Sequence, residues 1–205
     1  MADSPFNLEY QSRSTEGRII AGLDKIGQAF RVLLWHEGKD LSLSPLQIQI
    51  LIFLFNHSRE YRKVSYLALE FGITKATVSD AVKSLMDKHL ILKDYDSADT
   101  RTFTLNLTRE GKHVTERISG FSRELQVPVE KLSEQQKEIL LSTLMTMIKH
   151  LNEVGIITTQ RMCFSCQHYR SNHQGHMHYC GLVDAPLASM QLRLDCPEHR
   201  AGVRS

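Results

Sequence analysis

Residues 64–90 read VSYLALEFGITKATVSDAVKSLMDKHL, and this stretch decides the fold. Ser65 is placed to cap a short helix, Gly72 to break it, and Thr74 to cap a longer helix that runs to about His89. Three residues fit the point where two helices nearly touch. They are the small residue Ala68, Gly72, which tolerates positive φ, and the β-branched Val78. The stretch therefore predicts a helix-turn-helix.

A hairpin is predicted directly after this unit. ILKDY (91–95) and TFTLNL (102–107) read as strands, and the apolar side chains of the second strand alternate onto one face. The polar segment DSADTR (96–101) between them predicts a turn with Arg101 near its tip. The predicted fold class is mainly α with a small β-wing (α+β), a winged helix-turn-helix.

The outer face of the second helix carries Lys, Thr, Ser, Asp and Lys, beside a basic hairpin. Such a surface suits the major groove of DNA and the adjoining minor groove. The alternative is a winged helix that contacts only protein, because a fold does not by itself fix a function.

The overall charge is a weak argument for a nucleic-acid partner. The chain of 205 residues has a formal net charge of +2, and residues 59–112 hold ten Lys or Arg against eight Asp or Glu. Affinity for DNA would depend on where the basic side chains lie, summed over two subunits, and it would fall with rising salt. The basic residues concerned include Arg62, Lys63, Lys75, Lys83 and Arg101.

Other function classes find little support in the sequence. No apolar run approaches the roughly 20 residues that span a bilayer, and the N-terminus lacks an apolar signal core, so we expect a cytoplasmic protein with no membrane contact. The chain lacks a glycine-rich phosphate loop, an H-E-x-x-H helix and a G-x-S-x-G turn, so we expect no enzyme. His57 and the other histidines before the cysteine-rich tail read as helix-end or surface residues.

Long helices are predicted on both sides of the winged unit. One covers about Thr15 to His36. Another begins at the capping box of Ser44 and Gln47, and its apolar run 48–55 belongs in the core. After the wing, Thr108 caps a helix with one apolar stripe, which Pro128 ends or kinks. A further capping box at 133–136 opens a helix that Gly155 stops.

These flanking helices are longer than a winged unit needs for itself. Their apolar stripes most economically pair with those of a second copy, which predicts a homodimer. Two-fold symmetry would set two recognition helices roughly 34 Å apart and require an inverted-repeat site. The alternative is that the helices pack only within one chain.

Residues from about Arg18 to Val154 resemble the MarR family of bacterial transcription regulators. The resemblance rests on LSPLQIQILIFL (43–54), on TKATVSDAVKSLMDKHLI (74–91) and on DYDSADTRTFTLNLTREG (94–111). It implies an obligate dimer on double-stranded DNA, with recognition helices in successive major grooves and Arg101 in the minor groove. The helix residues that would face DNA are Lys75, Thr77, Ser79 and Lys83. Asp80 would either accept a hydrogen bond from a cytosine amino group or orient a neighbouring lysine.

The C-terminal segment is a different object. We divide the chain into a MarR-like unit (1–155, with a DNA-binding core of about 44–112) and a four-cysteine segment (156–205). All four cysteines of the chain fall within 34 residues, as C-x2-C, a gap of thirteen, and a gap of fifteen. In a reducing compartment such thiols are better read as metal ligands or redox sensors than as disulfides. The predicted ligands are Cys163, Cys166, Cys180 and Cys196.

The identity of the metal is left open between two cofactors. Four thiolates suit a zinc ion, which we prefer, and they also suit an iron–sulfur cluster. The segment lacks the second C-x2-C of a regular zinc ribbon, and its five histidines are kept off the ligand list. A third interpretation is four reduced thiols or a thiol redox switch. The predicted function is a dimeric DNA-binding regulator with a structural or sensing metal tail and a small-molecule or redox effector; the alternative is a metal-bearing module that binds protein.

Overall fold

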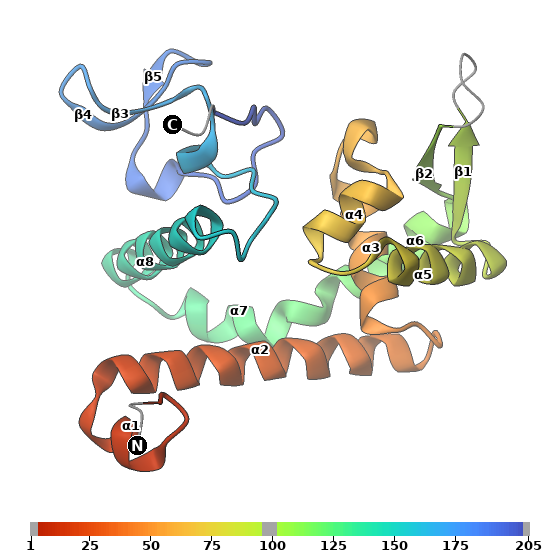
Figure 1. The fold of residues 1–205 in the computed structure, drawn as a ribbon, viewed down its shortest axis with the longest axis horizontal. Helices are drawn as coiled ribbons and strands as arrows, with labels where there is room; N and C mark the ends of the chain where they lie inside the picture. The colour runs from red at the N-terminus through yellow and green to blue at the C-terminus, as the bar shows by residue number, and fades with distance from the viewer. Residues whose placement is uncertain (1–3, 96–101, 203–205) are drawn as a thin grey trace.

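The computed structural model describes residues 4–95 and 102–202 (Figure 1). The helices and strands of the N-terminal part follow one another as α1 (Leu8–Arg13), α2 (Thr15–Lys39), α3 (Pro45–Asn56), α4 (Val64–Glu70), α5 (Lys75–Asp87), β1 (Ile91–Tyr95), β2 (Phe103–Leu107), α6 (Arg109–Ile118), α7 (Arg123–Glu130) and α8 (Glu134–Glu153). The tail adds β3 (Tyr169–His173), β4 (His176–Cys180) and β5 (Ala185–Pro186). Short 3-10 turns are η1 (Arg59–Tyr61), η2 (Ser119–Ser122), η3 (Cys163–Ser165) and η4 (Ser189–Gln191).

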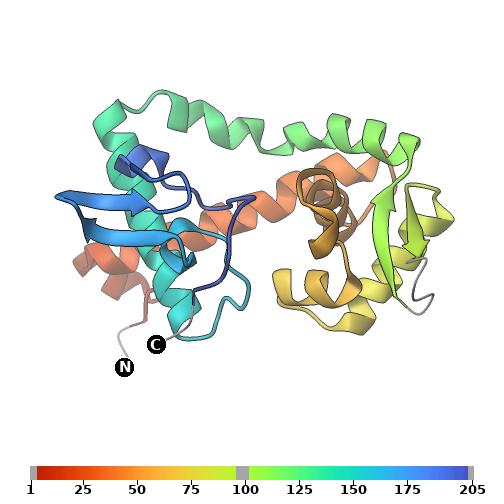
Figure 2. The same ribbon diagram turned by 90° about the horizontal axis from the view of Figure 1, so that it is seen from above.

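The long helix α2 runs the length of the molecule (Figure 1). The winged unit of α3–α6 with β1 and β2 lies at one end, and α8 with the tail lies at the other. Seen from above, α6 and α7 follow one another along one side and connect the two ends (Figure 2). The fold class predicted from the sequence, mainly helical with a small antiparallel wing, is confirmed.

Side-chain caps start most helices where the sequence predicted them. Ser44 and Ser133 each form a capping box, and Thr74 and Thr108 each accept a backbone N–H of the first helical turn. Gly155 has φ +78° directly after the cap of α8, as expected of a helix-stopping glycine. These signals are local, so they act wherever the rest of the chain packs.

Three details of the predicted helices were wrong. The first helix of the helix-turn-helix begins at Val64 after Lys63, without a side-chain cap, so Ser65 lies inside it. The helix after the wing is not continuous, because a 3-10 turn separates α6 from α7. Pro128 lies inside α7, which continues to Glu130. A proline removes a single N–H, and this loss is tolerated two residues before a short helix ends anyway.

The main core fills the winged unit. It includes the buried residues of α3 and joins α2, α4, α5, the wing and α6. The prediction that the apolar run 48–55 belongs in the core is confirmed except at its last residue, Phe55, which is 39% exposed. Gly111, from the TREG part of the MarR-like stretch, lies against the backbone carbonyl of Leu90, where a Cβ atom would collide. This contact lets α6 start directly beside the wing.

The tail has a much smaller core and a sheet of its own. Strands β3, β4 and β5 pair antiparallel in that order, with Tyr169 opposite Cys180. The buried residues of the second cluster are Met145 of α8, Met162 and Leu192. Met145 therefore fills this small core. The sheet was not predicted.

Candidate nucleic-acid interface and four-cysteine site

Helix α5 presents two chemically different faces. Its inward side chains are buried against the winged core: Val78, Ala81, Val82 and Leu85. Its other face is exposed and carries every helix residue for which a DNA contact was predicted: Lys75, Thr77, Ser79, Asp80 and Lys83. Thr74 caps the helix by accepting the Thr77 N–H at 3.1 Å. The sequence therefore folds into a capped helix whose exposed face carries the predicted DNA-contacting residues.

The wing stands beside this helix. Strands β1 and β2 pair antiparallel from Ile91 opposite Leu107 to Tyr95 opposite Phe103. Leu105 donates its N–H to the carbonyl of Arg62 at 2.8 Å, so the segment after η1 extends the hairpin. Arg101, the predicted minor-groove residue, lies outside the described residues.

Arg62 differs from the exposed lysines of α5. Its Nε donates to the carbonyl of His57 at 2.8 Å, and its Nη1 donates to Asn106 Oδ1 at 3.0 Å. Burial lowers the pKa of this guanidinium. Arg62 thus connects the end of α3 to the wing, and much of its hydrogen-bonding capacity is used within the chain.

The four thiols of the tail line one small cavity of about 30 Å³. Cys163 and Cys166 come from one 3-10 turn, Cys180 ends β4, and Cys196 comes from the last loop. Among residues 4–95 and 102–202, no group of three or more His, Cys, Asp or Glu has side chains already arranged to hold a metal ion. The cavity therefore gathers the predicted ligands without a finished coordination geometry.

Cys163 is half-buried and accepts a hydrogen bond from the backbone. The backbone N–H of Arg193 donates to Cys163 Sγ at 3.2 Å. Groups outside the coordination sphere commonly orient metal ligands by such hydrogen bonds. Burial raises the pKa of the Cys163 thiol, the Arg193 N–H lowers it, and the three other cysteines raise it further. The net shift of this pKa is upward, because burial, the largest of these effects, favours the neutral thiol.

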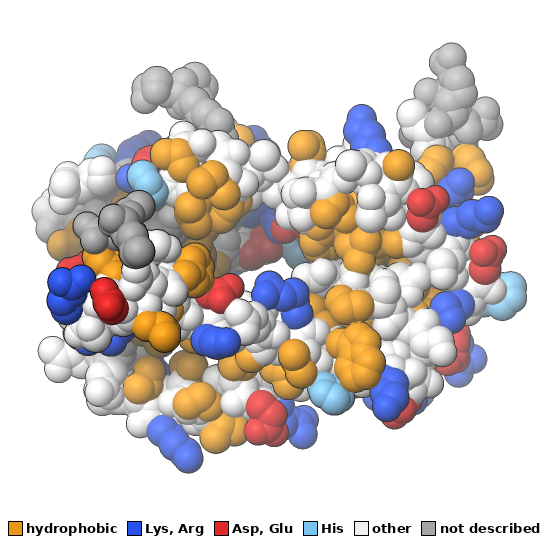
Figure 3. All heavy atoms as spheres, turned by 60° about the horizontal axis from the view of Figure 1, so that its bottom comes forward, with side chains coloured by type: hydrophobic (Ala, Val, Ile, Leu, Met, Phe, Trp, Pro, Cys, Tyr) orange, Lys and Arg blue, Asp and Glu red, His pale blue; other side chains and the backbone are white. Residues whose placement is uncertain are grey.

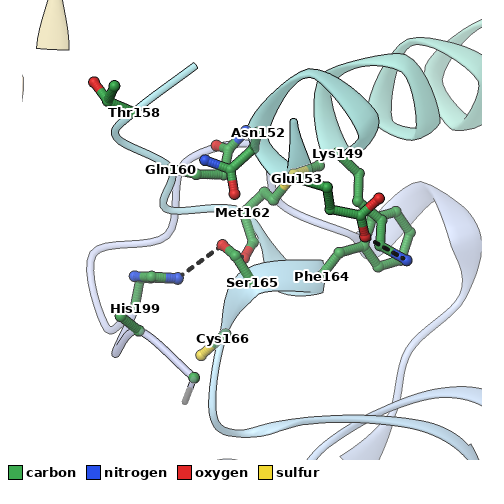
Figure 4. A pocket seen from close by; sticks show the side chains of 12 residues that line it. Lys149, Asn152, Glu153, Thr158, Gln160, Met162, Phe164, Ser165, Cys166 and His199 are labelled. Carbon is green, nitrogen blue, oxygen red and sulfur yellow. Dashed lines mark hydrogen bonds and ion pairs between the residues drawn. The ribbon is translucent and has the colours of Figure 1, made fainter. Parts of the chain in front are cut away.

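Two histidines of the tail lie near the thiols. His168 lines the thiol cavity, and His199 is buried and contacts Ser165 Oγ through Nε2 at 3.0 Å. Burial lowers the pKa of His199. His199 lies in a second cavity of about 670 Å³ between the end of α8 and the tail, which Figure 4 shows with Lys149, Glu153 and Phe164 on its walls.

The tail is joined to the winged unit by a buried arginine. Arg161 is 7% exposed, and its guanidinium makes paired hydrogen bonds to two carboxylates. Glu70 of α4 accepts at 2.8 and 3.0 Å, and Asp195 accepts at 2.7 and 2.8 Å. The hydroxyl of Tyr66 accepts a fifth bond at 2.6 Å. All five N–H groups of the guanidinium therefore have an oxygen partner.

Aromatic side chains of the winged unit enclose the same guanidinium. Its Cζ lies 5.4 to 5.8 Å from the ring centres of Phe53, Tyr61 and Tyr66. His57 stacks on Phe53 and contacts Asp195 Oδ2 through Nε2 at 2.8 Å. We call the set of Arg161, Glu70, Asp195, His57 and Tyr66 the Arg161 cluster.

Asp195 is held in its ionised form by this arrangement. Burial opposes the charge of its carboxylate, but the hydrogen bonds from Arg161 and His57 outweigh burial and hold the pKa of Asp195 well below its usual range. Removing one partner from a buried, hydrogen-bonded ion pair of this kind strongly destabilises a protein, because the other charge is left without compensation.

Sequence reasoning missed the Arg161 cluster. It placed no role on Arg161, Glu70 or Asp195, and it read His57 as a helix-end or surface residue. His57 does cap α3. An arginine two residues before the first cysteine and an aspartate directly before the last were the available signals, but only the folded chain shows that they meet.

Within residues 4–95 and 102–202, no helix is both long enough and apolar enough to cross a bilayer.

Comparison with known proteins identifies relatives of the N-terminal part. No family model matches the chain. The HTH-type transcriptional repressor YetL of Bacillus subtilis is 22% identical over 135 residues, which is 65% of this chain and 81% of YetL.

Solved structures resemble the same part of the fold. The Staphylococcus aureus MepR–DNA complex has a TM-score of 0.56 at 24% identity, covering 71% of this chain and 99% of MepR. MepR in its DNA-binding conformation has a TM-score of 0.57 at 24% identity, covering 65% of this chain and 98% of MepR. At this level of identity the likeness shows the fold: the chain shares the winged helix-turn-helix architecture of MarR-type regulators such as MepR.

Proposed function

We propose that this protein is a sequence-specific regulator of transcription that binds double-stranded DNA as a homodimer. The observation that carries the proposal is the two-faced helix α5, whose exposed side carries Lys75, Thr77, Ser79, Asp80 and Lys83 while its inner side is buried. A helix of this kind fits the major groove, where Lys83, Ser79 and Asp80 would reach base edges. Lys75 and the N-terminal turn of α5 would meet phosphates.

The relatives support the same function. YetL is named as a transcriptional repressor, and the MepR structure that shares this fold is a DNA complex. Since this chain shares the winged helix-turn-helix fold of MepR, we carry DNA binding over to it. Arg101, at the wing, would enter the minor groove.

A second copy of the chain would cover exposed apolar side chains of the long helices. Figure 3 brings the α2 side of the molecule forward and shows apolar side chains interspersed with charged ones. On α2 the large hydrophobic residues that remain exposed are Ile19, Ile20, Ile26, Phe30, Val32 and Trp35. Exposed apolar surface on this scale is typical of an interaction face. A two-fold dimer through these helices would place two α5 helices on an inverted repeat.

The tail would hold a zinc ion through Cys163, Cys166, Cys180 and Cys196. The four thiols line one cavity, and four thiolates complete the tetrahedral coordination of a single zinc ion, which we prefer to an iron–sulfur cluster. The backbone N–H of Arg193 would donate a hydrogen bond to the Cys163 thiolate that binds the ion. When bound, zinc would neutralise the clustered thiolates and fold a segment that contributes only Met162 and Leu192 to the buried residues of the second cluster.

Selection of binding sites tests the DNA proposal. Zinc-loaded protein is mixed with random double-stranded oligonucleotides, and the retained sequences should contain inverted repeats with half-sites one helical turn apart. The substitutions Lys83→Ala and Arg101→Ala should each weaken binding about tenfold or more, whereas Lys149→Ala on α8 should not. Unchanged binding in the first two variants would contradict the proposed docking.

Metal analysis and spectroscopy test the cofactor. Protein purified without oxygen should be colourless and hold one zinc per chain, and the loss of Cys180 should abolish zinc retention. A brown protein with a broad visible band would make the iron–sulfur cluster the cofactor. A chain that binds no DNA but retains its metal would favour the alternative function, a metal-bearing module that binds protein through the winged helix.

A further inference from the structure

The two halves of the proposed regulator meet at one side chain. Arg161 lies two residues before Cys163, and Asp195 lies directly before Cys196. Their backbones are also joined, because the Cys196 N–H donates to the Arg161 carbonyl at 2.9 Å. The segments that deliver two of the four thiols therefore also deliver both tail members of the Arg161 cluster.

The other members of the cluster belong to the winged unit. Glu70 and Tyr66 are on α4, which packs against the recognition helix α5, and His57 ends α3. The linker adds to the contact, since Thr158 donates to the Leu69 carbonyl and Thr159 to Glu70 Oε2, each at 3.0 Å. The end of α4 is thus held by hydrogen bonds from the segment that precedes Cys163.

We infer that the four-thiol site regulates DNA binding through Arg161, which acts as a positioning residue for α4. The inference rests on the proposed function and adds the route by which the tail acts. With the four thiols held together, Asp195 is fixed and Arg161 keeps both carboxylate partners. When the thiols separate, the Cys196 loop releases Asp195, and Arg161 retains Glu70 without the opposing carboxylate.

The release of Asp195 changes α4 because the guanidinium of Arg161 is planar and enclosed. Its planar fork satisfies both carboxylates only in one orientation, and three aromatic rings surround it. Losing one bidentate partner leaves buried N–H groups without acceptors, so the guanidinium must reorient or become hydrated. Either change weakens the contacts that hold the end of α4, and the position of α5 depends on its packing against α4. The tail therefore controls the recognition helix while lying outside the DNA-facing surface.

The experiment compares zinc-loaded protein with protein stripped of zinc under reducing conditions. The readouts are amide hydrogen exchange of residues 64–70 and affinity for a selected DNA site. In the wild type we expect stripping to speed the exchange of these amides and to weaken DNA binding at least tenfold. The variant Asp195→Asn keeps all four thiols but cuts the link, so stripping should change its affinity less than twofold.

Controls separate the link from general damage. Glu153→Gln is the same carboxylate-to-amide change on α8, away from Arg161, and it should respond to stripping as the wild type does. Arg161→Lys keeps the charge but cannot bind both carboxylates in pairs, so its response should be intermediate. Equal zinc content in all variants shows that the metal site itself is intact.

The outcomes distinguish this inference from the proposed function. If zinc-loaded wild type binds no DNA, the proposed function fails, and exchange of residues 64–70 still decides the coupling. If stripping weakens DNA binding equally in wild type and Asp195→Asn, or leaves the exchange of 64–70 unchanged in wild type, the coupling through Arg161 is overturned. A chain that takes up no zinc also overturns it.

Discussion

The winged unit and the tail are stabilised in different ways. The winged unit buries a continuous apolar cluster drawn from α2 to α6, whereas the tail buries Met162 and Leu192 against Met145 of α8. A segment with so small a core needs another source of stability, and four thiols around one cavity offer it. The comparison teaches that one chain can combine a fold with a large apolar core and a segment with a small one, for which we propose a bound zinc ion as the further source of stability.

Removal of the metal is the strongest way to break this comparison. Structural zinc contributes about 10 kcal/mol or more in small cysteine-rich folds, so chelation should unfold residues 161–202 while α3 to α6 keep their helical structure. Limited proteolysis with mass spectrometry checks this, and equal cleavage of both regions after chelation would contradict it.

A cavity in the winged core tests the other side of the comparison. Leu54 is fully buried, so Leu54→Ala should lower the free energy of unfolding of the winged unit by about 3 kcal/mol. Leu69→Ala provides the control, because Leu69 is 53% exposed and its loss should change the same quantity by about 0.5 kcal/mol or less. Urea unfolding followed by circular dichroism measures both. Zinc content should remain at one per chain, and its loss in Leu54→Ala would show that the two regions do not fold independently.

The arginine that joins the two regions should have an intermediate effect. Arg161→Met keeps the apolar stem but leaves the carboxylates of Glu70 and Asp195 facing each other. Because Asp195 is 47% exposed, solvent relieves part of this repulsion, and we expect a loss of about 2 kcal/mol in the free energy of unfolding. Arg170→Met, on an exposed residue of the same tail, should be nearly neutral in the same urea titration. Equal effects of the two changes would mean that Arg161 does not join the regions.

The smallest effect is expected at the cap of the recognition helix. Thr74→Ala removes the acceptor of the Thr77 N–H and should lower the free energy of unfolding by about 1 kcal/mol. Thr74→Ser keeps the hydroxyl and should retain most of that stability. Hydrogen exchange at the first turn of α5 gives the local readout, and fast exchange confined to the tail in Thr74→Ala would contradict the assignment.

Local signals explain which parts of the fold were predictable. The caps at Ser44, Thr74, Thr108 and Ser133 use side chains within three residues of the N–H groups that they accept, so no distant contact is needed to recognise them. No local signal marked the break between α6 and α7, and there the sequence-based prediction of one continuous helix was wrong.

The candidate site divides in the same way. The polar outer face of α5 follows from a helical period of 3.6 residues, so the exposed residues from Lys75 to Lys83 could be named from the sequence. The cysteine spacing likewise indicated which thiols belong together. His57 does lie at a helix end, as predicted, but its contact with Asp195 could not be predicted, because the contact spans 138 residues of sequence and no local pattern marks it.

The sequence by itself determined the helix-turn-helix, the wing and the identity of the four thiols, because each depends on residue types at short, regular spacing. Only the tertiary structure decided that Arg161 lies between Glu70 and Asp195, and that the tail rests on α4. The physical reason is that a buried charge is stable only where its partners converge, and those partners come from parts of the chain that meet only when it is folded.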